Sequence, residues 1–515
     1  MNVRMLTLAA VLCLAAASAR AQVGSGNISG TITDEQGAVL PGVVITLTSA
    51  DRTATFTTGT DGRYRFLALP PGHYTVTAAL TGFGTIVREQ IEVRVGQNVD
   101  LPMQMRVATL QETVTVTGES PLVDARAMGT ATNFTQDELS RIPTSRDPWA
   151  LLRTVPGVVV DRVNIAGNET GQQSGFTAKG IPSSQSTWTL DGVVITDSAA
   201  VGASPSYFDY DSFEEIQIST AGADIRQPTG GVGLNMVVKR GTNAFRGGFK
   251  GYYTNDALEA TNIPDELAAT GVTAETTDHN DEIMEWGGDI GGPIVRDRLW
   301  FWGSYVEQDI RLIRRQVRGI DRTVLKTANF KTNWQATQKD MVSFLWFNGD
   351  KVKEGRSTGF SGIEARTATW NQQNFTNDSL PPGLFKIQDD RVFSSSLFLS
   401  AKYAYYNTGF TLDPIGGLDM QGGRSSRLGQ TYGSFVGQYF RRPQHTINVD
   451  GQYFLTAGGG NHELKVGFAR RQSDAATEVI YPGDMVYAFD DPTRQYVNIY
   501  RTGNSLNRAF FLSAY

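Results

Sequence analysis

The chain has 515 residues, with 46 Lys and Arg against 52 Asp and Glu, which gives a formal net charge of −6. This balance does not favour a nucleic-acid partner, because proteins that bind nucleic acid present a basic surface. The length is enough for about three or four domains. The content of glycine, aromatic and β-branched residues, without long apolar helical stretches, predicts a mainly β fold.

Residues 1–21 have the features of a secretory signal peptide. Arg4 provides the positive start, an apolar stretch follows, and small residues at positions 19 and 21 predict cleavage between Ala21 and Gln22. The apolar stretch is too short to be a membrane-spanning helix. The single cysteine, Cys13, lies inside this segment. The exported chain is therefore expected to contain neither a disulfide nor a thiol nucleophile.

Residues 24–105 show short strand patterns separated by turn signals, which is the spacing of an all-β sandwich. The expected strands cover residues 27–33, 43–48, 64–67 and 74–79. ISGTITDEQGAVLPGVVITL and TDGRYRFLALPPGHYTVTAALTGF closely resemble the carboxypeptidase regulatory-like domain, a transthyretin-like sandwich of the carbohydrate-binding-like fold group. The resemblance implies a structural or docking role, with sugar binding as the less favoured alternative. His73 has no companion at metal-ligand spacing, so a catalytic metal is not expected.

The segment LQETVTVTG, residues 110–118, is rich in β-branched residues, which favour an extended backbone. It can be one more ordinary strand. Alternatively, it resembles the TonB box, a segment that adds as a strand to the sheet of a partner and transmits force through main-chain hydrogen bonds. The residues that this resemblance assigns to TonB binding are Glu112, Thr113, Val114, Thr115, Val116, Thr117 and Gly118.

Residues 119–243 carry signals for short helices and a series of motifs. Thr135 and Glu138 form a capping box, and Asp147-Pro148 predicts a second helix start. The motifs resemble, in the same order, those of the plug domain of TonB-dependent receptors: ALLRTVPGVVVD, GFTAKGIPSSQSTWTLDGVVITD, SFEEIQISTAGADIRQ and TGGVGLNMVVKRGTN. Lys179 departs from the arginine found in many plugs, which keeps the charge but loses bidentate pairing.

Residues 244–515 contain long segments in which apolar and polar residues alternate. In TANFKTNWQ, residues 327–335, Phe330 and Trp334 fall on one face of an extended chain. Asn329 and Lys331 fall on the other face. Repeated segments of this kind are what a transmembrane antiparallel β-barrel requires, with lipid outside and a polar lumen inside; a soluble β protein is the alternative.

The same region resembles the Oar-like barrels of TonB-dependent proteins that carry a regulatory-like domain in front, most closely around GGDIGGPIV and LWFWGSYVEQ. The aromatic residues of the second motif are expected either in the interfacial girdle or in a core. Charged stretches at 309–318 and 349–356, and long segments at 254–280, 351–364 and 411–430, are expected to be exposed loops.

About ten strands can be recognised between residues 244 and 515, whereas a plugged outer-membrane transporter has about twenty-two. We therefore expect a truncated chain. Its expected parts are a signal peptide (1–21), the sandwich (22–106), the TonB box with the plug (107–243) and a partial barrel (244–515).

Enzyme motifs are missing from the sequence: there is no G-x-S-x-G, no G-x-x-x-x-G-K and no H-E-x-x-H. The histidines are scattered. An acidic cluster of Asp209, Asp211, Glu214 and Glu215 can hold calcium, but a solvated surface is the favoured interpretation. We therefore expect no catalytic residue, no metal and no cofactor.

These resemblances imply a receptor in the outer membrane of a Gram-negative, or diderm, bacterium, exported by the Sec route. Its expected partners are outer-membrane lipid, the TonB energy-transducing complex and an extracellular ligand, which is a glycan, a peptide or a chelate. The alternative is an Oar-like adhesion or matrix-export protein without nutrient uptake.

Overall fold

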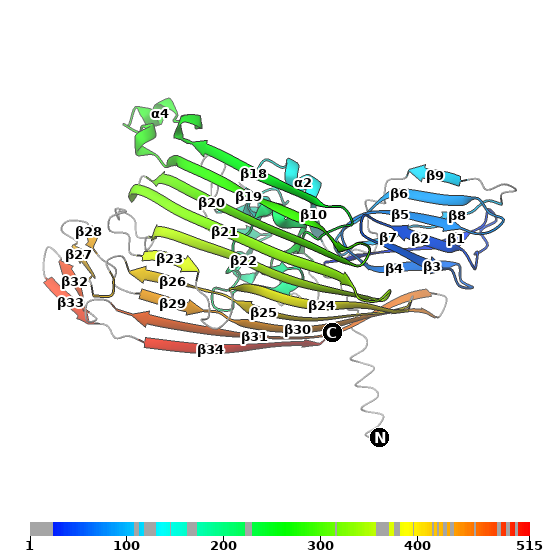
Figure 1. Cartoon of the computed structure of the whole chain (residues 1–515). Coiled ribbons are helices and arrows are strands. Elements are labelled where there is room, and N and C mark those ends of the chain that lie inside the picture. Colours follow the sequence, from blue (N-terminus) through cyan, green and yellow to red (C-terminus); the bar gives the residue numbers. More distant parts are fainter. Residues whose placement is uncertain are drawn as a thin grey trace, which may run out of the picture.

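The computed structural model describes residues 24–107, 113–117, 130–144, 146–161, 173–221, 229–314, 317–356, 370–374, 382–394, 396–414, 417–419, 422–425, 430–432, 437–457, 460–481, 486–490, 495–499 and 503–514. The predicted cleavage site at Ala21 and Gln22 lies outside these ranges, as do Glu112 and Gly118. Three parts are visible in Figure 1: a small β-sandwich, a plug, and a large curved sheet. No helix among the described residues is long and apolar enough to cross a membrane.

The N-terminal sandwich consists of two sheets. One has the order β4-β1-β7, with β8 also paired to β1, and the other has the order β3-β2-β5-β6-β9. The strands are β1 (Gly26–Thr33), β2 (Val44–Thr48), β3 (Thr53–Thr57), β4 (Arg63–Leu69), β5 (Gly72–Ala79), β6 (Thr85–Val93), β7 (Asn98–Asp100), β8 (Met103–Gln104) and β9 (Thr113–Thr117). Alternate residues such as Ile28, Ile45 and Val76 form the core between the sheets. The predicted strands agree with β1, β2, β4 and β5.

The plug contains a mixed five-stranded sheet of order β10-β16-β17-β14-β15 and a small sheet of order β11-β12-β13. Both predicted helix starts are confirmed: Thr135 and Glu138 complete the capping box of α2, and Asp147 caps α3. The elements are β10 (Thr130–Thr135), α2 (Gln136–Arg141), α3 (Pro148–Leu152), β11 (Val158–Val160), β12 (Phe176–Ala178), β13 (Ile181–Pro182), η1 (Ser183–Gln185), β14 (Thr187–Leu190), β15 (Val193–Val194), η2 (Tyr210–Ser212), β16 (Phe213–Ala221) and β17 (Gly233–Val238).

Thirteen of the described strands form the large sheet. Three of the long strands are each split into two consecutive segments: β23 and β24, β25 and β26, and β29 and β30. When each split strand is counted once, ten strands lie side by side, as predicted. The strands are β18 (Arg246–Asn255), β19 (His279–Val295), β20 (Leu299–Arg314), β21 (Val317–Gln335), β22 (Asp340–Arg356), β23 (Trp370–Asn374), β24 (Gly383–Ser394), β25 (Leu397–Asn407), β26 (Gly409–Pro414), β29 (Gly437–Arg441), β30 (Gln444–Ala457), β31 (Gly460–Ile480) and β34 (Gly503–Ala514).

Two smaller groups of elements lie at the end of the large sheet away from the sandwich (Figure 1). Short helices follow β18, and a separate four-stranded sheet has the order β28-β27-β32-β33. The bounds are η3 (Asp256–Leu258), α4 (Asp265–Ala268), η4 (Ala274–Thr276), β27 (Gly422–Ser425), β28 (Gln430–Tyr432), β32 (Val486–Asp490) and β33 (Gln495–Ile499). The longer connections therefore lie opposite the sandwich, at the end that faces the cell exterior in an outer-membrane barrel.

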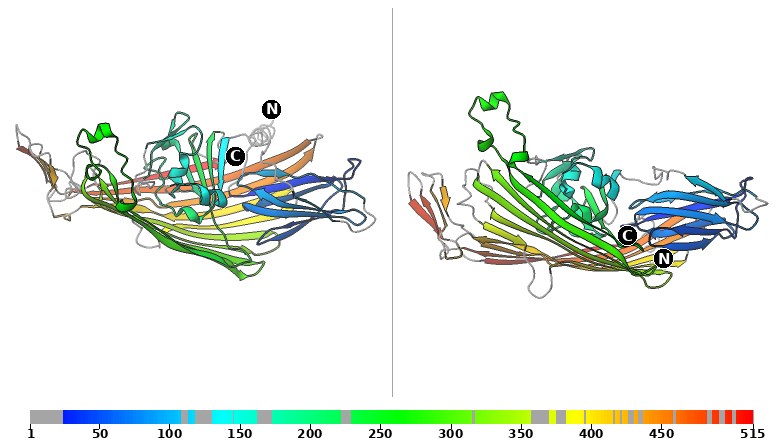
Figure 2. Two further views of the ribbon diagram at one scale, coloured as in Figure 1. Left: turned by 90° about the horizontal axis from the view of Figure 1, so that it is seen from above. Right: turned by 45° about the horizontal axis from the view of Figure 1, so that its top comes forward.

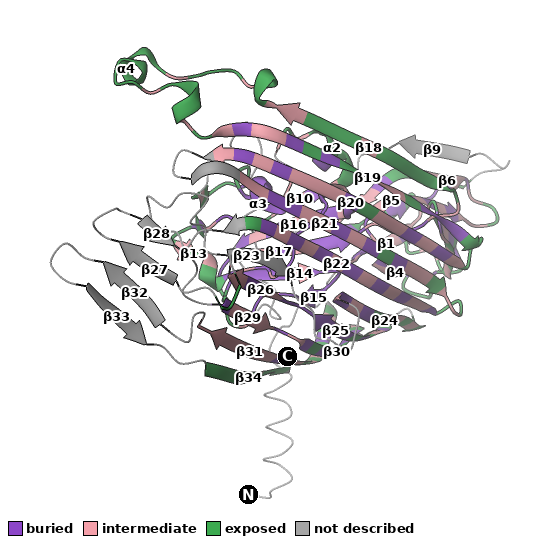
Figure 3. Ribbon diagram, turned by 60° about the vertical axis from the view of Figure 1, so that its left-hand side comes forward, coloured by how far each residue is buried: buried purple, intermediate pink, exposed green. Residues whose placement is uncertain are grey.

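The two faces of the large sheet have opposite chemistry, as the alternation predicts. On β21, Phe330 and Trp334 are 40% and 43% exposed on the outer face, whereas Asn329 and Lys331 are buried on the inner face. Figure 2 shows the plug on the concave side of the sheet, and Figure 3 shows β18 and β34 as largely exposed strands. The plug therefore covers the polar face and leaves the apolar face for lipid.

Several expected loops are strands, and this part of the prediction is wrong. Residues 309–314 continue β20, and residues 349–356 continue β22, where Lys351 and Lys353 are buried. Parts of 411–430 belong to β26 and β27. Asp309 and Arg311 misled the prediction because they pair with Arg322 and Glu282 of neighbouring strands, and Lys351 and Lys353 because they lie on the plug-facing side of β22. Trp300 and Trp302 of β20 are also buried on that side, which excludes these two side chains from an interfacial girdle.

Candidate functional site

The expected TonB-box segment lies beside the sandwich and away from the plug. Residues 113–117 form β9, which pairs in parallel with β6 from Thr85↔Thr113 to Glu89↔Thr117. The backbone of this segment is therefore extended, as its β-branched residues predict. Its assignment to TonB binding stays a prediction.

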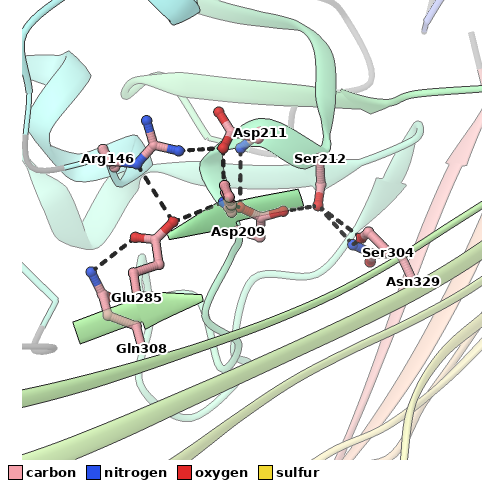
Figure 4. A network of polar contacts seen from close by, with 9 residues as sticks. Arg146, Asp209, Asp211, Ser212, Glu285, Ser304, Gln308 and Asn329 are labelled. Atoms are coloured by element: carbon pink, nitrogen blue, oxygen red, sulfur yellow. Dashed lines mark hydrogen bonds and ion pairs between the residues drawn. The ribbon is translucent and has the colours of Figure 1, made fainter. Parts of the chain in front are cut away.

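A cluster of carboxylates joins the plug to the first strands of the large sheet (Figure 4). Asp209 and Asp211 come from the loop and short helix before β16, and Glu285 comes from β19. Their oxygens are close enough to one another to bind a metal ion. However, the Lys250 ammonium of β18 lies 2.6, 2.7 and 2.8 Å from oxygens of Asp209, Asp211 and Glu285. The lysine thus supplies the positive charge that a cation would bring.

A second cation and several neutral groups complete this cluster. Arg146, just before α3, pairs with Asp211, and its Nε lies 3.5 Å from Glu285. Ser212 Oγ donates to Asp209 Oδ2 at 2.8 Å and accepts from Asn329 Nδ2 of β21 at 2.8 Å. Plug and strands therefore share one continuous polar network, which Figure 4 follows from Arg146 to Asn329.

The favoured interpretation of the acidic cluster, a solvated surface, is wrong for two of its four members. Asp209 and Glu215 are buried, and only Asp209 and Asp211 belong to the cluster with Glu285. Glu214 and Glu215 are adjacent in β16, at an irregularity in its pairing with β17. Glu214 lines a cavity with Arg240, whereas Glu215 accepts from the Val95 amide, so the two neighbours in the sequence have different surroundings.

A second charged contact is centred on Asp191, in the turn between β14 and β15. Its carboxylate lies 2.8 Å from Lys331 Nζ of β21 and 3.0 Å from Lys386 Nζ of β24, and it accepts from the Val238 amide at 3.0 Å. Burial alone would raise the pKa of Asp191, but the two lysines outweigh it and hold the pKa well below its usual range. Asp191 is therefore ionised and anchors the plug to two strands.

Further lysines and one glycine bring the plug and the sheet together. Lys402 of β25 donates to the carbonyl oxygen of Gly192 at 2.6 Å, next to Asp191. A Cβ at Gly349 of β22 would lie only 2.0 Å from the carbonyl oxygen of Tyr207, so glycine is required there. Lys351, two residues further, donates to the Tyr207 hydroxyl at 3.0 Å. These lysines were not singled out in the sequence, although their place on the polar face of alternating strands was a usable signal.

Apolar packing accompanies the charged contacts. Trp149 of α3 and Trp188 of β14 have ring centroids 5.0 Å apart, and Phe208 lies 5.5 Å from Phe347 of β22. The buried plug core continues onto inward-facing residues of the large sheet, including Leu345. The plug is therefore seated by a shared apolar core with buried ion pairs on either side of it.

The sandwich contacts the plug through one buried carboxylate. Glu215 of β16 accepts from the Val95 amide at 2.9 Å and from Asn133 Nδ2 of β10, and no cation lies within ion-pair distance of it among the described residues. Burial raises the pKa of Glu215 to about 7, because these hydrogen bonds only partly offset the loss of water. Gln217 Nε2 also donates to the Val95 carbonyl at 3.0 Å.

A second contact joins the sandwich to the segment after β17. Arg240 Nη1 lies 2.6 Å from Asp51 Oδ2, and the Asn243 amide donates to the Ala50 carbonyl at 3.4 Å. Arg240 and Glu214 also line a cavity where the sandwich, the plug and strands β21, β22, β24, β25 and β30 meet. The sandwich is thus fixed to the plug at two places. Both lie near the end of the large sheet at which short turns connect its strands.

The comparisons with known proteins agree with this arrangement. Three family models match in chain order: the carboxypeptidase regulatory-like domain over residues 27–106, the TonB-dependent receptor plug domain over 124–233, and the outer membrane beta barrel domain over 237–325. The chain is 29% identical over 290 residues to the TonB-dependent transporter Oar of Myxococcus xanthus. That match covers 55% of this chain and 26% of the relative.

Two solved structures show the same fold at low identity. The outer membrane transporter YddB from Escherichia coli is 14% identical with a TM-score of 0.54, and the match covers 74% of this chain and 54% of that one. BauA, the ferric preacinetobactin receptor from Acinetobacter baumannii, is 11% identical with a TM-score of 0.50, over 72% of this chain and 50% of that one. The chain thus spans about half the length of these structures. The family resemblances stated from the sequence are confirmed.

Proposed function

Because this chain is a TonB-dependent receptor of the outer membrane, with a plug, barrel strands and an N-terminal carboxypeptidase regulatory-like domain, we propose that it binds an extracellular ligand and imports it past the plug. The proposed ligand is a glycan, a peptide or a chelate. The energy comes from the TonB complex of the inner membrane. The family is not enzymatic, which agrees with the lack of a catalytic constellation in the sequence.

The observation that carries this proposal is how the plug is held. It covers the polar face of the large sheet through hydrogen bonds and ion pairs such as Asp191 with Lys331 and Lys386. Water can replace polar contacts of this kind once a plug begins to move, at a lower cost than exposing a purely apolar interface. A plug that is held by such contacts can rearrange and then return to its original position.

An external source of energy is needed because binding alone only shifts populations between states. In the proposed mechanism, TonB pairs with residues 112–118 by strand addition and pulls on the plug. The segment lies before β10 in the chain, so tension on it reaches the edge of the plug sheet first.

The test is a proline in the proposed TonB box. Val114→Pro removes a main-chain donor, so we expect capture of the membrane-embedded receptor by a purified periplasmic TonB domain to fall at least tenfold. Val114→Ile keeps the donor and the β-branched shape and is the matched control. Unchanged capture of the proline variant would refute this role of residues 112–118.

The adhesion or matrix-export alternative predicts a different phenotype. A deletion strain is compared with the wild type for growth on panels of glycans, peptides and iron chelates and for adhesion between cells. Import predicts a growth defect on one class of nutrient. A loss of adhesion with normal growth on every panel would favour the alternative.

A further inference from the structure

The edge of β6 is the place in the sandwich where another strand can add. In the sheet order β3-β2-β5-β6-β9, β6 would be an edge strand without β9. An exposed edge presents unpaired N–H and C=O groups and is a template for strand addition. Figure 1 shows β9 beside β6, on the side of the sandwich away from the large sheet.

The chain itself leads the segment to this edge. The Gly84 amide donates to the Arg106 carbonyl at 2.9 Å, and Phe83 forms an isolated antiparallel bridge with Val107. These contacts lie directly before β6 begins at Thr85. Residues 113–117 then run parallel to β6 from its first residue. The segment therefore reaches the β6 edge directly from the last residues of the sandwich.

The length of the available edge matches the length of β9. Gln90 has a positive φ of 58°, which interrupts the extended backbone of β6, and the register between β5 and β6 is irregular between Tyr74 and Val76. The regular part of the edge thus runs from Thr85 to Glu89. β9 pairs with all five of these residues and stops at Thr117.

We propose that the β6 edge is the resting site of the TonB-box segment, so that the sandwich and TonB compete for the same backbone groups of residues 113–117. The inference rests on the proposed function, which assigns TonB binding to this segment. The sandwich is anchored to the plug through Glu215 and Arg240. It therefore holds the segment beside the docked sandwich until TonB displaces β6.

The length of the connecting chain limits how far residues 113–117 can move after they are released from β6. The sandwich holds the chain up to Val107, which forms a bridge with Phe83, and Thr115 lies eight residues further along. Eight extended residues span about 28 Å. Displacement from β6 thus lets the centre of the segment move outward by at most about that distance while the sandwich stays docked.

A disulfide across the pairing tests the proposal in the full chain. Val87 and Thr115 are register partners, and neighbouring strands lie about 4.8 Å apart, which is within the range of Cα separations for a disulfide. The only cysteine in the sequence is Cys13, in the predicted signal peptide, so the new bond is unambiguous. We expect Val87→Cys with Thr115→Cys to crosslink in most molecules in the oxidising periplasm without TonB.

The control pair is Thr85→Cys with Thr117→Cys, on the same two strands but four residues out of register, which separates the sites by about 13 Å. We expect little crosslinking in this pair. The second readout is capture by the purified periplasmic TonB domain. Capture of the oxidised in-register variant should fall at least tenfold and return to the wild-type level on reduction.

The outcomes separate this inference from the proposed function. Equal crosslinking of both pairs would overturn the resting site, and full capture of the oxidised in-register variant would overturn the competition. Neither result touches the assignment of residues 112–118, which the Val114→Pro variant tests by itself. Conversely, the in-register cysteine pair could crosslink while Val114→Pro is captured as well as the wild type. That result would show that TonB is not the competitor for this segment.

Discussion

The plug has two neighbours, and it is held by each in a different way. The strands of the large sheet present lysines to plug carboxylates, as Lys331 and Lys386 do to Asp191. The sandwich presents a main-chain amide to Glu215, with the Arg240–Asp51 pair as a second contact. A nearby cation favours the ionised carboxylate, whereas burial without a cation favours the protonated one, because neutral donors only partly offset the loss of water. The contact with the large sheet should therefore be insensitive to pH near neutrality, and the contact with the sandwich should not.

The largest effect is expected from Asp191→Asn. The substitution leaves Lys331 and Lys386 buried without their counter-charge, which should destabilise the seated plug by about 3–5 kcal/mol. Hydrogen exchange of β14 and β17 in the detergent-solubilised receptor measures this loss. Adding Lys331→Met and Lys386→Met should recover part of it. Unchanged protection in Asp191→Asn would contradict the anchoring role.

A smaller effect is expected from Lys250→Met, because Arg146 still neutralises part of the cluster. Asp209 and Glu285 would remain buried near each other, at a cost of about 2–3 kcal/mol. Denaturant unfolding measures the change. Lys326→Met removes a lysine that is 44% exposed and paired with Glu307 at 4.0 Å, and should cost no more than about 1 kcal/mol. Equal losses in both variants would show that burial of the cluster does not matter.

The contact between sandwich and plug should depend on pH through Glu215. Its pKa is raised from 4.5 to about 7 in the folded protein, so the contact is strongest below pH 4.5 and weakens as the pH rises towards 7. The total change is on the order of 3 kcal/mol. Protection of the Val95 amide, corrected for intrinsic exchange, measures it. Glu215→Gln should flatten the profile, and a flat wild-type profile would contradict the assignment.

The smallest effect is expected from Asp137→Ala. Asp137 pairs with Arg141 on α2, and the two side chains are 68% and 76% exposed. Exposed pairs of this kind contribute about 0.3–0.5 kcal/mol. Denaturant unfolding at low and high salt measures the change. A loss well above about 1 kcal/mol would show that α2 contributes to seating the plug more than its exposed position indicates.

Much of the architecture follows from local patterns in the sequence. The alternation in TANFKTNWQ predicts both the strand and its two faces, because successive side chains must point to opposite sides. The capping residues Thr135 and Asp147 locate both plug helices through local hydrogen bonds. In contrast, charge was a poor guide to loops. Lys351 and Lys353 lie in β22 because the plug and neighbouring strands supply their partners.

The candidate sites depended on contacts between distant segments. Asp191 lies within the plug motif GFTAKGIPSSQSTWTLDGVVITD, and only the fold places Lys331 of β21 and Lys386 of β24 beside it. Glu214 and Glu215 looked like part of one acidic cluster with Asp209 and Asp211. The structure instead places Glu215 against the Val95 amide of the sandwich.

The amino-acid sequence alone determined the order of the parts, the polar and apolar faces of the strands, and the extended character of residues 113–117, because these depend on spacing and on local backbone preference. Only the tertiary structure decided which carboxylate meets which cation, and which sheet edge holds β9. Those choices require segments far apart in the chain to lie side by side, and the free energy of an ion pair or a strand pairing depends on that proximity and on burial.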